Sequence, residues 1–278
     1  MNSKLKYFPK YEQLNWKEKW FLNTCCYFPP KPRRIRGDDV TIDLERYLTL
    51  FKTAYGTVIF EDIKNKRILD FGCGEGGFSL ALAANNPQSY VLGIDIVDGL
   101  KSAKKKQSDL QLNNLQFVIG HSNFLKDNSF DYIFSHDSFE HFEDPVYVLN
   151  EMTRLVKPKG FILIKFGPTW ASPYGRHMSG TIKKSWPWIH LLVSEKTIMR
   201  AHSVYHDRSN LYENYSDLVG GLNKMTVNKA MQIFNSFEDL EIKEKKIKYV
   251  WKGQLLKSIP YLNELFSGSL YVKLQKRN

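Results

Sequence analysis

The chain has 278 residues, 42% of them hydrophobic and 25% charged, and a formal net charge of +11. This apolar content excludes a wholly disordered chain, and the length fits one main domain with appendages. The longest apolar runs, such as residues 160–166, fall well short of the ~20 residues that a membrane-spanning helix needs. The N-terminus is basic but lacks the apolar run of a secretory signal. We therefore expect a soluble, cytoplasmic protein without a membrane span.

The cysteines and the basic residues limit the class further. Three cysteines, two of them adjacent at Cys25 and Cys26, make neither a disulfide framework nor a CxxC metal pair, which fits a reducing compartment. Basic clusters lie at 31–36, 101–106 and 243–252. They are either solvated faces of helices and strands or a surface for nucleic acid, acidic lipid or an anionic substrate.

Strand and helix patterns alternate through the middle of the chain. Short apolar segments with strand character lie at 67–72, 89–95, 115–120, 129–135 and 161–166. Helical segments lie at 76–86, 97–112 and 143–156, with a turn at 157–160. Asp144 is a plausible cap of the last of these helices, with Pro145 in its first turn. Such alternation predicts an α/β fold whose parallel sheet is covered by helices on both faces.

The two ends of this pattern look different. Residues 1–56 carry their own aromatics and predict an N-terminal helical extension. Residues 167–225 are rich in Trp, Tyr, His, Gly and Pro, which predicts an insertion rather than another strand–helix unit. A helix at 226–237 and strands at 240–251 and 269–276 then restore the order. We expect an extension at 1–56 and a main domain at 57–278 that contains the insertion 167–225.

The segment "LDFGCGEGG" stands at the first strand-to-helix turn. Glycines such as Gly72 and Gly74 let the backbone turn sharply and come close to a ligand. Asp70 precedes the first glycine by two residues, and Asp95 ends the next strand. Nicotinamide-dependent enzymes use a similar glycine turn, and also an acid on the ribose, so these features alone leave the cofactor open.

The later segment 128–164 separates the alternatives. Together with the acid-x-Gly-x-Gly-x-Gly turn, its "NSFD" start and its "LVKPKG" end resemble the class I S-adenosylmethionine-dependent methyltransferases, in particular the type 11-like group. The resemblance covers about residues 66–166. It implies a Rossmann-like fold with a seven-stranded, mostly parallel sheet, to which this chain adds its N-terminal extension and an inserted lid. It also implies S-adenosylmethionine as cofactor and methyl transfer as reaction.

The resemblance assigns a cofactor site residue by residue. Asp70, Gly72 and Gly74 would face the methionine end, and Asp95 the ribose hydroxyls, because a carboxylate can accept two hydrogen bonds from a diol. Ile96 would cover one face of the adenine. At the end of the fourth strand, Ser135 and His136 would flank the methionine moiety, largely through backbone contacts.

The chain lacks the acid that would be expected to bind the amino group of the cofactor's adenine. Many relatives carry an acid after the third strand, but this chain has "GHSN" at 120–123. The contact must then come from Ser122, Asn123, His121 or a backbone carbonyl. A hydroxyl or amide oxygen can accept from the same amine, so cofactor binding stays the expectation.

The segment D-x-x-E-H supplies candidate catalytic residues. Asp137, Glu140 and His141 would share one face if a helical turn begins there, and such groups suit a divalent metal ion. The spacing resembles the E-x-x-E-H segment of small-RNA 2′-O-methyltransferases and ubiquinone-type O-methyltransferases, with Asp137 in place of the first glutamate. The former complete a magnesium site with a later histidine, for which His177 is the candidate here. The alternatives are a metal-free pocket with His141 or His177 as general base, and a purely structural role.

The acceptor pocket has to come from the variable segments. Four aromatic residues could line a lid, the core of the insertion or a dimer face, and four basic residues could hold a carboxylate or phosphate. The aromatic residues are Trp170, Tyr174, Trp186 and Trp188, and the basic residues are Arg34, Arg36, Arg176 and Lys183.

Three functions follow from these features. The favoured one is methyl transfer to a small-molecule acceptor, on a hydroxyl, by in-line displacement with help from a histidine base or a metal. The second is RNA 2′-O-methylation, which the net charge supports although no RNA-binding module accompanies it. The third is a methyltransferase-fold subunit that binds a partner without chemistry. The sequence leaves the oligomeric state open, including a homodimer.

Overall fold

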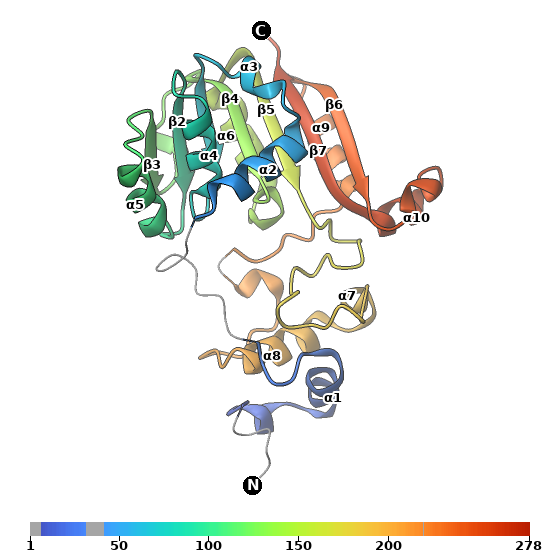
Figure 1. The fold of residues 1–278 in the computed structure, drawn as a ribbon. Helices are drawn as coiled ribbons and strands as arrows, with labels where there is room; N and C mark the ends of the chain where they lie inside the picture. The colour runs from blue at the N-terminus through green and yellow to red at the C-terminus, as the bar shows by residue number, and fades with distance from the viewer. Residues whose placement is uncertain (1–6, 32–41, 219) are drawn as a thin grey trace.

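A computed structural model describes residues 7–31, 42–218 and 220–278, and its larger part is a single twisted sheet (Figure 1). Its seven strands follow the order β3-β2-β1-β4-β5-β7-β6, and all neighbours are parallel except β7, which runs antiparallel to β5 and β6. The strands are β1 (Arg67–Phe71), β2 (Tyr90–Asp95), β3 (Leu115–Ile119), β4 (Phe130–His136), β5 (Val156–Phe166), β6 (Leu240–Tyr249) and β7 (Ser267–Lys276). The predicted seven-stranded, mostly parallel Rossmann-like sheet is confirmed.

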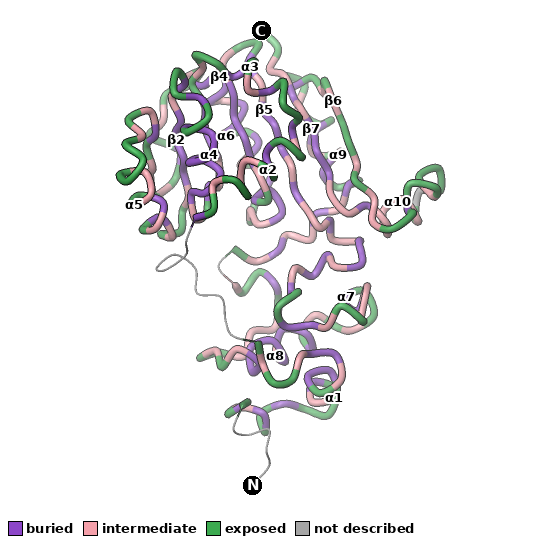
Figure 2. The backbone as a smooth tube through the Cα atoms, in the orientation of Figure 1, coloured by how far each residue is buried: buried purple, intermediate pink, exposed green. Residues whose placement is uncertain are grey.

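Helices cover both faces of the sheet. On one face lie α2 (Leu44–Tyr55), α3 (Ile59–Asp62), α4 (Gly77–Asn85) and α5 (Lys101–Asp109), and on the other α6 (Pro145–Leu155) and α9 (Val227–Asn235). Successive side chains of a strand point to opposite faces. Along β4, Ile133 accordingly packs in the core beside α6, and Phe134 in the core beside α2 and α4. Figure 2 shows the central strands buried along most of their length.

The fifth strand differs from its prediction. It begins at Val156, so the predicted turn at 157–160 lies within the strand. Phe130 of β4 pairs with Val156, the next pair joins Tyr132 to Phe161, and the intervening residues form an irregularity in which Lys159 has a φ of 63°. The turn signal of Pro and Gly therefore marks a bulge in a continuous strand rather than a loop.

A smaller lobe lies beyond the carboxyl ends of the parallel strands (Figure 1). It contains α1 (Trp16–Cys25), α7 (Ile189–Leu192) and α8 (Glu195–Tyr205), and its own buried core joins residues 8–26 to residues 178–222. Buried Glu18 pairs with Arg200 across α1 and α8, at 2.8 Å between Oε1 and Nε. The residues expected to form one N-terminal extension thus serve two cores, with α1 in the small lobe and α2 on the sheet.

The remaining elements are short. The α-helix α10 (Pro260–Phe266) stands between β6 and β7, and within the described part of the chain five 3₁₀ turns connect longer elements. The turns are η1 (Tyr11–Gln13), η2 (Ser122–Phe124), η3 (Phe139–His141), η4 (Tyr215–Asp217) and η5 (Gly253–Leu256). Among the described residues no helix has the length and apolar character to cross a membrane. All three cysteines are buried free thiols.

Candidate functional site

The glycine loop joins β1 to α4 and leaves room for a ligand. Gly72 and Gly74 have φ values of 81° and 54°, which favour glycine. A Cβ on Gly72 would lie 2.8 Å from the Cβ of Ser138, so this glycine lets the loop after β1 touch the loop after β4. A Cβ on Gly74 would meet no atom within 4 Å. Gly74 therefore faces open space, as a loop that cradles a cofactor requires.

Asp95 stands at the end of β2 with its carboxylate held in place. The N–H of Gly74 donates to Oδ2 at 2.7 Å, and the N–H of Val97 donates to Oδ1 at 2.9 Å. Each carboxylate oxygen retains a lone pair that could accept from a ribose hydroxyl. The neighbouring Ile96 is 65% exposed, so it offers apolar surface where an adenine ring is expected.

Asp70 and Ser135 lie deeper than a direct ligand contact would require. Asp70 is 1% exposed and accepts a hydrogen bond from Ser79 Oγ at 2.5 Å. Burial raises the pKa of this carboxyl to about 7, and the nearby charge of Asp95 adds to the rise, while the Ser79 hydrogen bond opposes it. Ser135 is fully buried, with its Oγ 2.8 Å from Ser138 Oγ. Both side chains support the loops from beneath.

The residues after β3 offer two kinds of group. Ser122 is buried, and its hydroxyl donates to Glu151 Oε2 at 2.8 Å, which fixes it to α6. Asn123 and His121 are exposed. Of these candidates for the adenine amine, only Asn123 combines exposure with an amide oxygen that can accept.

Helix α2 covers the glycine loop, a contact that the sequence did not reveal. A Cβ on Gly77 would lie 2.2 Å from the ring of Tyr47, so α2 packs directly on the first turn of α4. At the end of α2, Tyr55 OH lies 3.2 Å from Nδ1 of His136, the last residue of β4. These partners are 81 residues apart, and no local pattern in the sequence joins them.

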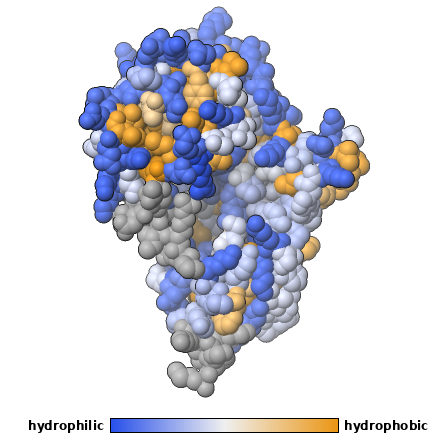
Figure 3. Space-filling model, viewed as in Figure 1, coloured by the Kyte–Doolittle hydropathy of each residue, from blue (hydrophilic) through white to orange (hydrophobic). Residues whose placement is uncertain are grey.

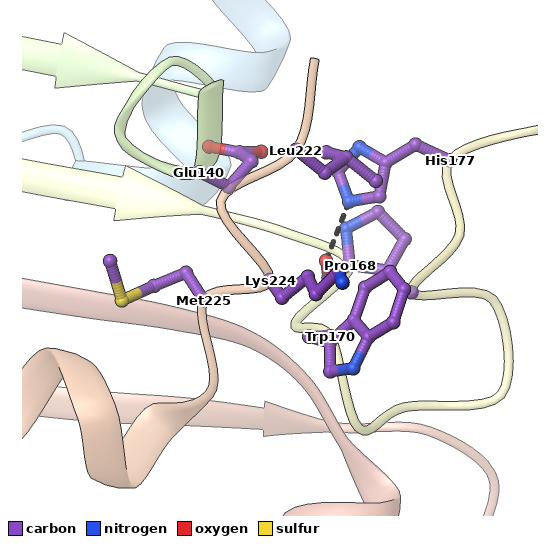
Figure 4. A pocket seen from close by; sticks show the side chains of 8 residues that line it. Glu140, Pro168, Trp170, His177, Leu222, Lys224 and Met225 are labelled. Atoms are coloured by element: carbon purple, nitrogen blue, oxygen red, sulfur yellow. Dashed lines mark hydrogen bonds between the residues drawn. The ribbon is translucent and has the colours of Figure 1, made fainter. Parts of the chain in front are cut away.

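Three of the four predicted metal or catalytic residues come together. Glu140 and His141 lie in η3, after β4, and His177 follows β5. One ligand atom from each of the three lies within 4.8 Å of the others. Figure 4 shows Glu140 and His177 lining a pocket together with Leu222, Pro168 and Trp170. We name this group the Glu140–His141–His177 cluster.

Backbone carbonyls orient both histidine rings. His141 Nδ1 lies 2.8 Å from the carbonyl oxygen of Gly220, and His177 Nε2 lies 2.7 Å from that of Pro168 (Figure 4). In each pair the ring nitrogen must donate, because a carbonyl only accepts. A neutral ring with this hydrogen bond has its lone pair on the other ring nitrogen, which is Nε2 in His141 and Nδ1 in His177. A carbonyl behind the ring is the usual support of a metal-binding histidine.

The cluster places a buried acid beside the His177 ring, which is neutral near pH 7. Glu140 is 2% exposed; Oε1 accepts from the N–H of Gly167 at 3.3 Å, and Oε2 has no hydrogen-bond partner among the described residues. Burial, followed by the charge of Asp137, raises the pKa of Glu140 to about 8. Burial lowers the pKa of His177 to about 4, so this ring is neutral near pH 7. The donor set of one oxygen and two nitrogens fits a divalent cation, which would also compensate the buried carboxylate.

Asp137 does not join the cluster, contrary to the expectation that it shares a face with Glu140 and His141. The 3₁₀ turn covers only residues 139–141, and Asp137 precedes it with a φ of 52°. Its Oδ1 lies 2.6 Å from Lys165 Nζ, and its Oδ2 lies 3.4 Å from His136 Nε2. Asp137 thus contacts His136, which also contacts Tyr55, and it lies outside the cluster.

The predicted acceptor residues divide between the pocket and the lobe. Trp170 lines the pocket, whereas Trp186 packs against Trp20 and Trp188 against Trp251. The hydroxyl of Tyr174 donates to a backbone carbonyl. Arg176 is 2% exposed and donates to two backbone carbonyls, and Lys183 donates to that of Thr24, so both hold the lobe together. Arg34 and Arg36 lie outside the described residues.

Comparison with known proteins identifies a methyltransferase domain in this chain. Residues 62–167 match the sequence profile of a family described as methyltransferase domain. An uncharacterized methyltransferase of Schizosaccharomyces pombe is 33% identical over 111 residues, which cover 37% of this chain and 40% of that protein. Demethylmenaquinone methyltransferase of Oceanobacillus iheyensis is 39% identical over 99 residues, which cover 34% of this chain and 42% of that protein. The chain spans about two fifths of the length of these curated relatives.

The fold agrees with a solved structure as well. An S-adenosylmethionine-dependent methyltransferase from Mesorhizobium loti superposes with a TM-score of 0.51 at 20% identity, over 77% of this chain and 92% of that one. Residues 62–167 are thus a methyltransferase domain, and the chain shares the fold of this solved methyltransferase. The profile match spans the strands β1 to β5 and leaves the small lobe and the strands β6 and β7 unmatched.

Proposed function

We propose that this protein transfers the methyl group of S-adenosylmethionine to a hydroxyl oxygen of a small acceptor held at the Glu140–His141–His177 cluster. The observation that carries this proposal is the convergence of an oxygen and two nitrogen ligand atoms within 4.8 Å of one another. The loop that bears Glu140 and His141 also packs on the glycine loop, where Phe142 lies 5.8 Å from Phe71 between ring centroids. The cofactor and the acceptor would thus meet at one place.

The cofactor half binds and orients. Open space at Gly74 admits the ligand, and Asp95 accepts from its ribose hydroxyls. Asp70 acts from beneath the loop on the ammonium of the methionine part through ordered water. When bound, S-adenosylmethionine supplies an electrophilic methyl group, so the protein's main task is to align the acceptor oxygen with it.

The cluster prepares the acceptor. Glu140 Oε2, His141 Nε2 and His177 Nδ1 would hold a divalent cation, which lowers the pKa of a bound hydroxyl and fixes its position. The metal-free alternative uses His141 or His177 to take the hydroxyl proton. The buried Glu140 oxygen without a partner favours the cation, because an uncompensated buried carboxylate is costly.

The acceptor class follows from the pocket walls. Pro168, Trp170, Leu222 and Met225 supply apolar surface beside Glu140 and His177. Such walls favour an apolar group beside the acceptor hydroxyl, and the pocket's empty volume of about 140 Å³ has room for only part of a ligand. The relative from Oceanobacillus iheyensis acts on demethylmenaquinone, but the profile match leaves the small lobe unmatched, so this acceptor is not carried over.

An RNA acceptor is the second candidate. Its support is the charge of α5, where Lys101, Lys104 and Lys105 are exposed immediately after the Asp95 loop. An RNA mobility shift that weakens steeply with salt would favour this function over a small acceptor.

The test measures release of S-adenosylhomocysteine with a panel of hydroxylated aromatic acceptors. We expect turnover that a chelator abolishes and Mn²⁺ or Mg²⁺ restores, with cofactor binding unchanged in calorimetry. Glu140→Gln should lose turnover, and Glu143→Gln, on the exposed side of the same loop, should keep it. Turnover that persists with the chelator would rule out a cation and support the mechanism with a histidine base. Failure to bind S-adenosylmethionine would contradict the whole proposal.

A further inference from the structure

The segment between β6 and β7 carries large side chains into solvent. We call residues 250–266 the β6–β7 projection, because α10 stands out from the side of the sheet there (Figure 1). Four of its residues are strongly exposed: Trp251 (60%), Leu255 (73%), Ile259 (47%) and Tyr261 (86%). Figure 3 shows hydrophobic surface at the tip of the projection, next to hydrophilic surface. Single exposed apolar residues are ordinary, but four within eleven positions form a patch.

The projection is firmly attached by its inner face. Tyr249 OH donates to Asn263 Oδ1 at 2.7 Å, and the carboxylate of Glu264 accepts the N–H groups of Val227 and Asn228 at the start of α9. Trp188 Nε1 donates to the carbonyl oxygen of Leu265 at 3.2 Å. These bonds fix the backbone, so the apolar side chains point outward in a defined arrangement.

The exposed charges of the projection are basic. Its lysines are Lys252 and Lys257, and its one acid, Glu264, faces inward onto the start of α9. Lys252 and Lys257 are exposed next to the apolar residues. Tryptophan and tyrosine prefer the interface between lipid tails and headgroups, and lysines attract anionic headgroups. A protruding apolar tip with only lysines around it therefore complements an anionic lipid surface in both shape and charge.

The projection also lies at the edge of the sheet that holds the functional site. Because β7 is antiparallel to both β5 and β6, β6 runs parallel to β5, and its carboxyl end lies at the same edge as that of β4. Trp188 of the small lobe packs on Trp251 at 5.4 Å between ring centroids. We propose that the β6–β7 projection docks the protein on an anionic lipid surface. This docking does not depend on the proposed methyl transfer.

The experiment is co-sedimentation of the full chain with vesicles of phosphatidylcholine, with and without one third of phosphatidylglycerol. We expect binding to the anionic vesicles that weakens at high salt. The affinity of the double variant Leu255→Asp/Tyr261→Asp for the vesicles should fall at least about tenfold, because the variant lacks apolar side chains that enter the interface. Lys252→Glu/Lys257→Glu should lose a similar factor on anionic vesicles only.

The matched control is Val58→Asp, which places the same charge on a side chain 72% exposed at the start of α3, far from α10 (Figure 1). It should bind like the wild type, and all variants should share its thermal unfolding midpoint. Equal vesicle binding by wild type and projection variants, or no binding by the wild type, would overturn the proposal. So would a dimer in sedimentation that Leu255→Asp dissociates, because the patch would then meet a second copy.

Discussion

The glycine loop and the Glu140–His141–His177 cluster hold their carboxylates in opposite ways. Asp95 accepts two backbone N–H groups, that of Gly74 in the glycine loop at 2.7 Å and that of Val97 at 2.9 Å. Glu140 is more deeply buried, yet its Oε2 has no partner among the described residues, and its pKa is raised to about 8. An unsatisfied buried polar atom costs about 1–3 kcal/mol. The cofactor side is thus complete by itself, whereas the acceptor side keeps a binding capacity that another group has to fill.

The largest expected effect tests the Glu140–His141–His177 cluster, where a carboxylate oxygen lacks a partner among the described residues. Glu140→Gln keeps the shape of the side chain but can no longer ionise to bind a cation, so turnover should fall about 10³–10⁴-fold, in the upper range of what a positioned acid–base or metal-binding group contributes. S-adenosylmethionine affinity should change little. Glu143→Gln is the control. A variant that loses cofactor binding together with turnover would show that the two sides are not separate.

At the cofactor side, a substitution should weaken S-adenosylmethionine binding in the first place. Asp95→Ala removes the carboxylate that would accept both ribose hydroxyls, and two charge-assisted hydrogen bonds correspond to about 4 kcal/mol, or roughly a thousandfold in affinity. Calorimetric titration with S-adenosylmethionine measures this loss. Asp98→Ala, an exposed acid three residues further along, should bind normally. Unchanged affinity in Asp95→Ala would remove this residue from the cofactor site.

Asp70 should make the stability of the protein depend on pH. Its pKa is about 7 in the folded protein and near 3.8 in the unfolded chain, so the folded state binds more protons between these values. Stability should therefore fall as the pH rises from about 4 to about 7 and then level off. Asp70→Asn stays neutral, so it should exceed the wild type by up to about 4 kcal/mol at pH 8 and equal it near pH 4. Urea unfolding at both pH values measures the difference, and a constant gap would contradict the raised pKa.

The smallest effect tests the junction of the two lobes. The side-chain amide of Asn223 donates to the carbonyl oxygens of Phe139 and Phe142, both at 2.9 Å. Asn223→Ala should lower the free energy of unfolding by about 2 kcal/mol and loosen the loop that bears Glu140. Urea unfolding measures the loss, with exposed Asn235→Ala as control. A neutral result would mean that the loop is held by other contacts.

The sequence predicted what depends on local pattern. Strand–helix alternation and the glycine turn define the sheet, and the positions of Asp95 and Ile96 at the end of β2 follow from them. The bulged start of β5 escaped because Pro158 and Gly160 carry a turn signal, whereas pairing with β4 decides the conformation. Local signals cannot report such tertiary pairing.

Long-range geometry accounts for the rest. The contact of Tyr55 with His136 joins segments that share no pattern, and α1 and α2 divide between two cores. Asp137 was grouped with Glu140 because their spacing suits a helix, but its positive φ and the ion pair with Lys165 turn it away. The aromatic residues of 167–225 lack periodicity, so the sequence could not distinguish pocket walls from the core of a lobe.

The most direct test of the central claim is a crystal structure with S-adenosylhomocysteine and Mn²⁺, read by anomalous scattering. The account predicts one Mn²⁺ bound by Glu140 Oε2, His141 Nε2 and His177 Nδ1 at about 2.0–2.3 Å. The cofactor sulfur should face this ion across a gap that admits one acceptor oxygen. A cluster without an ion at saturating Mn²⁺, or a sulfur that faces away from it, would contradict the account.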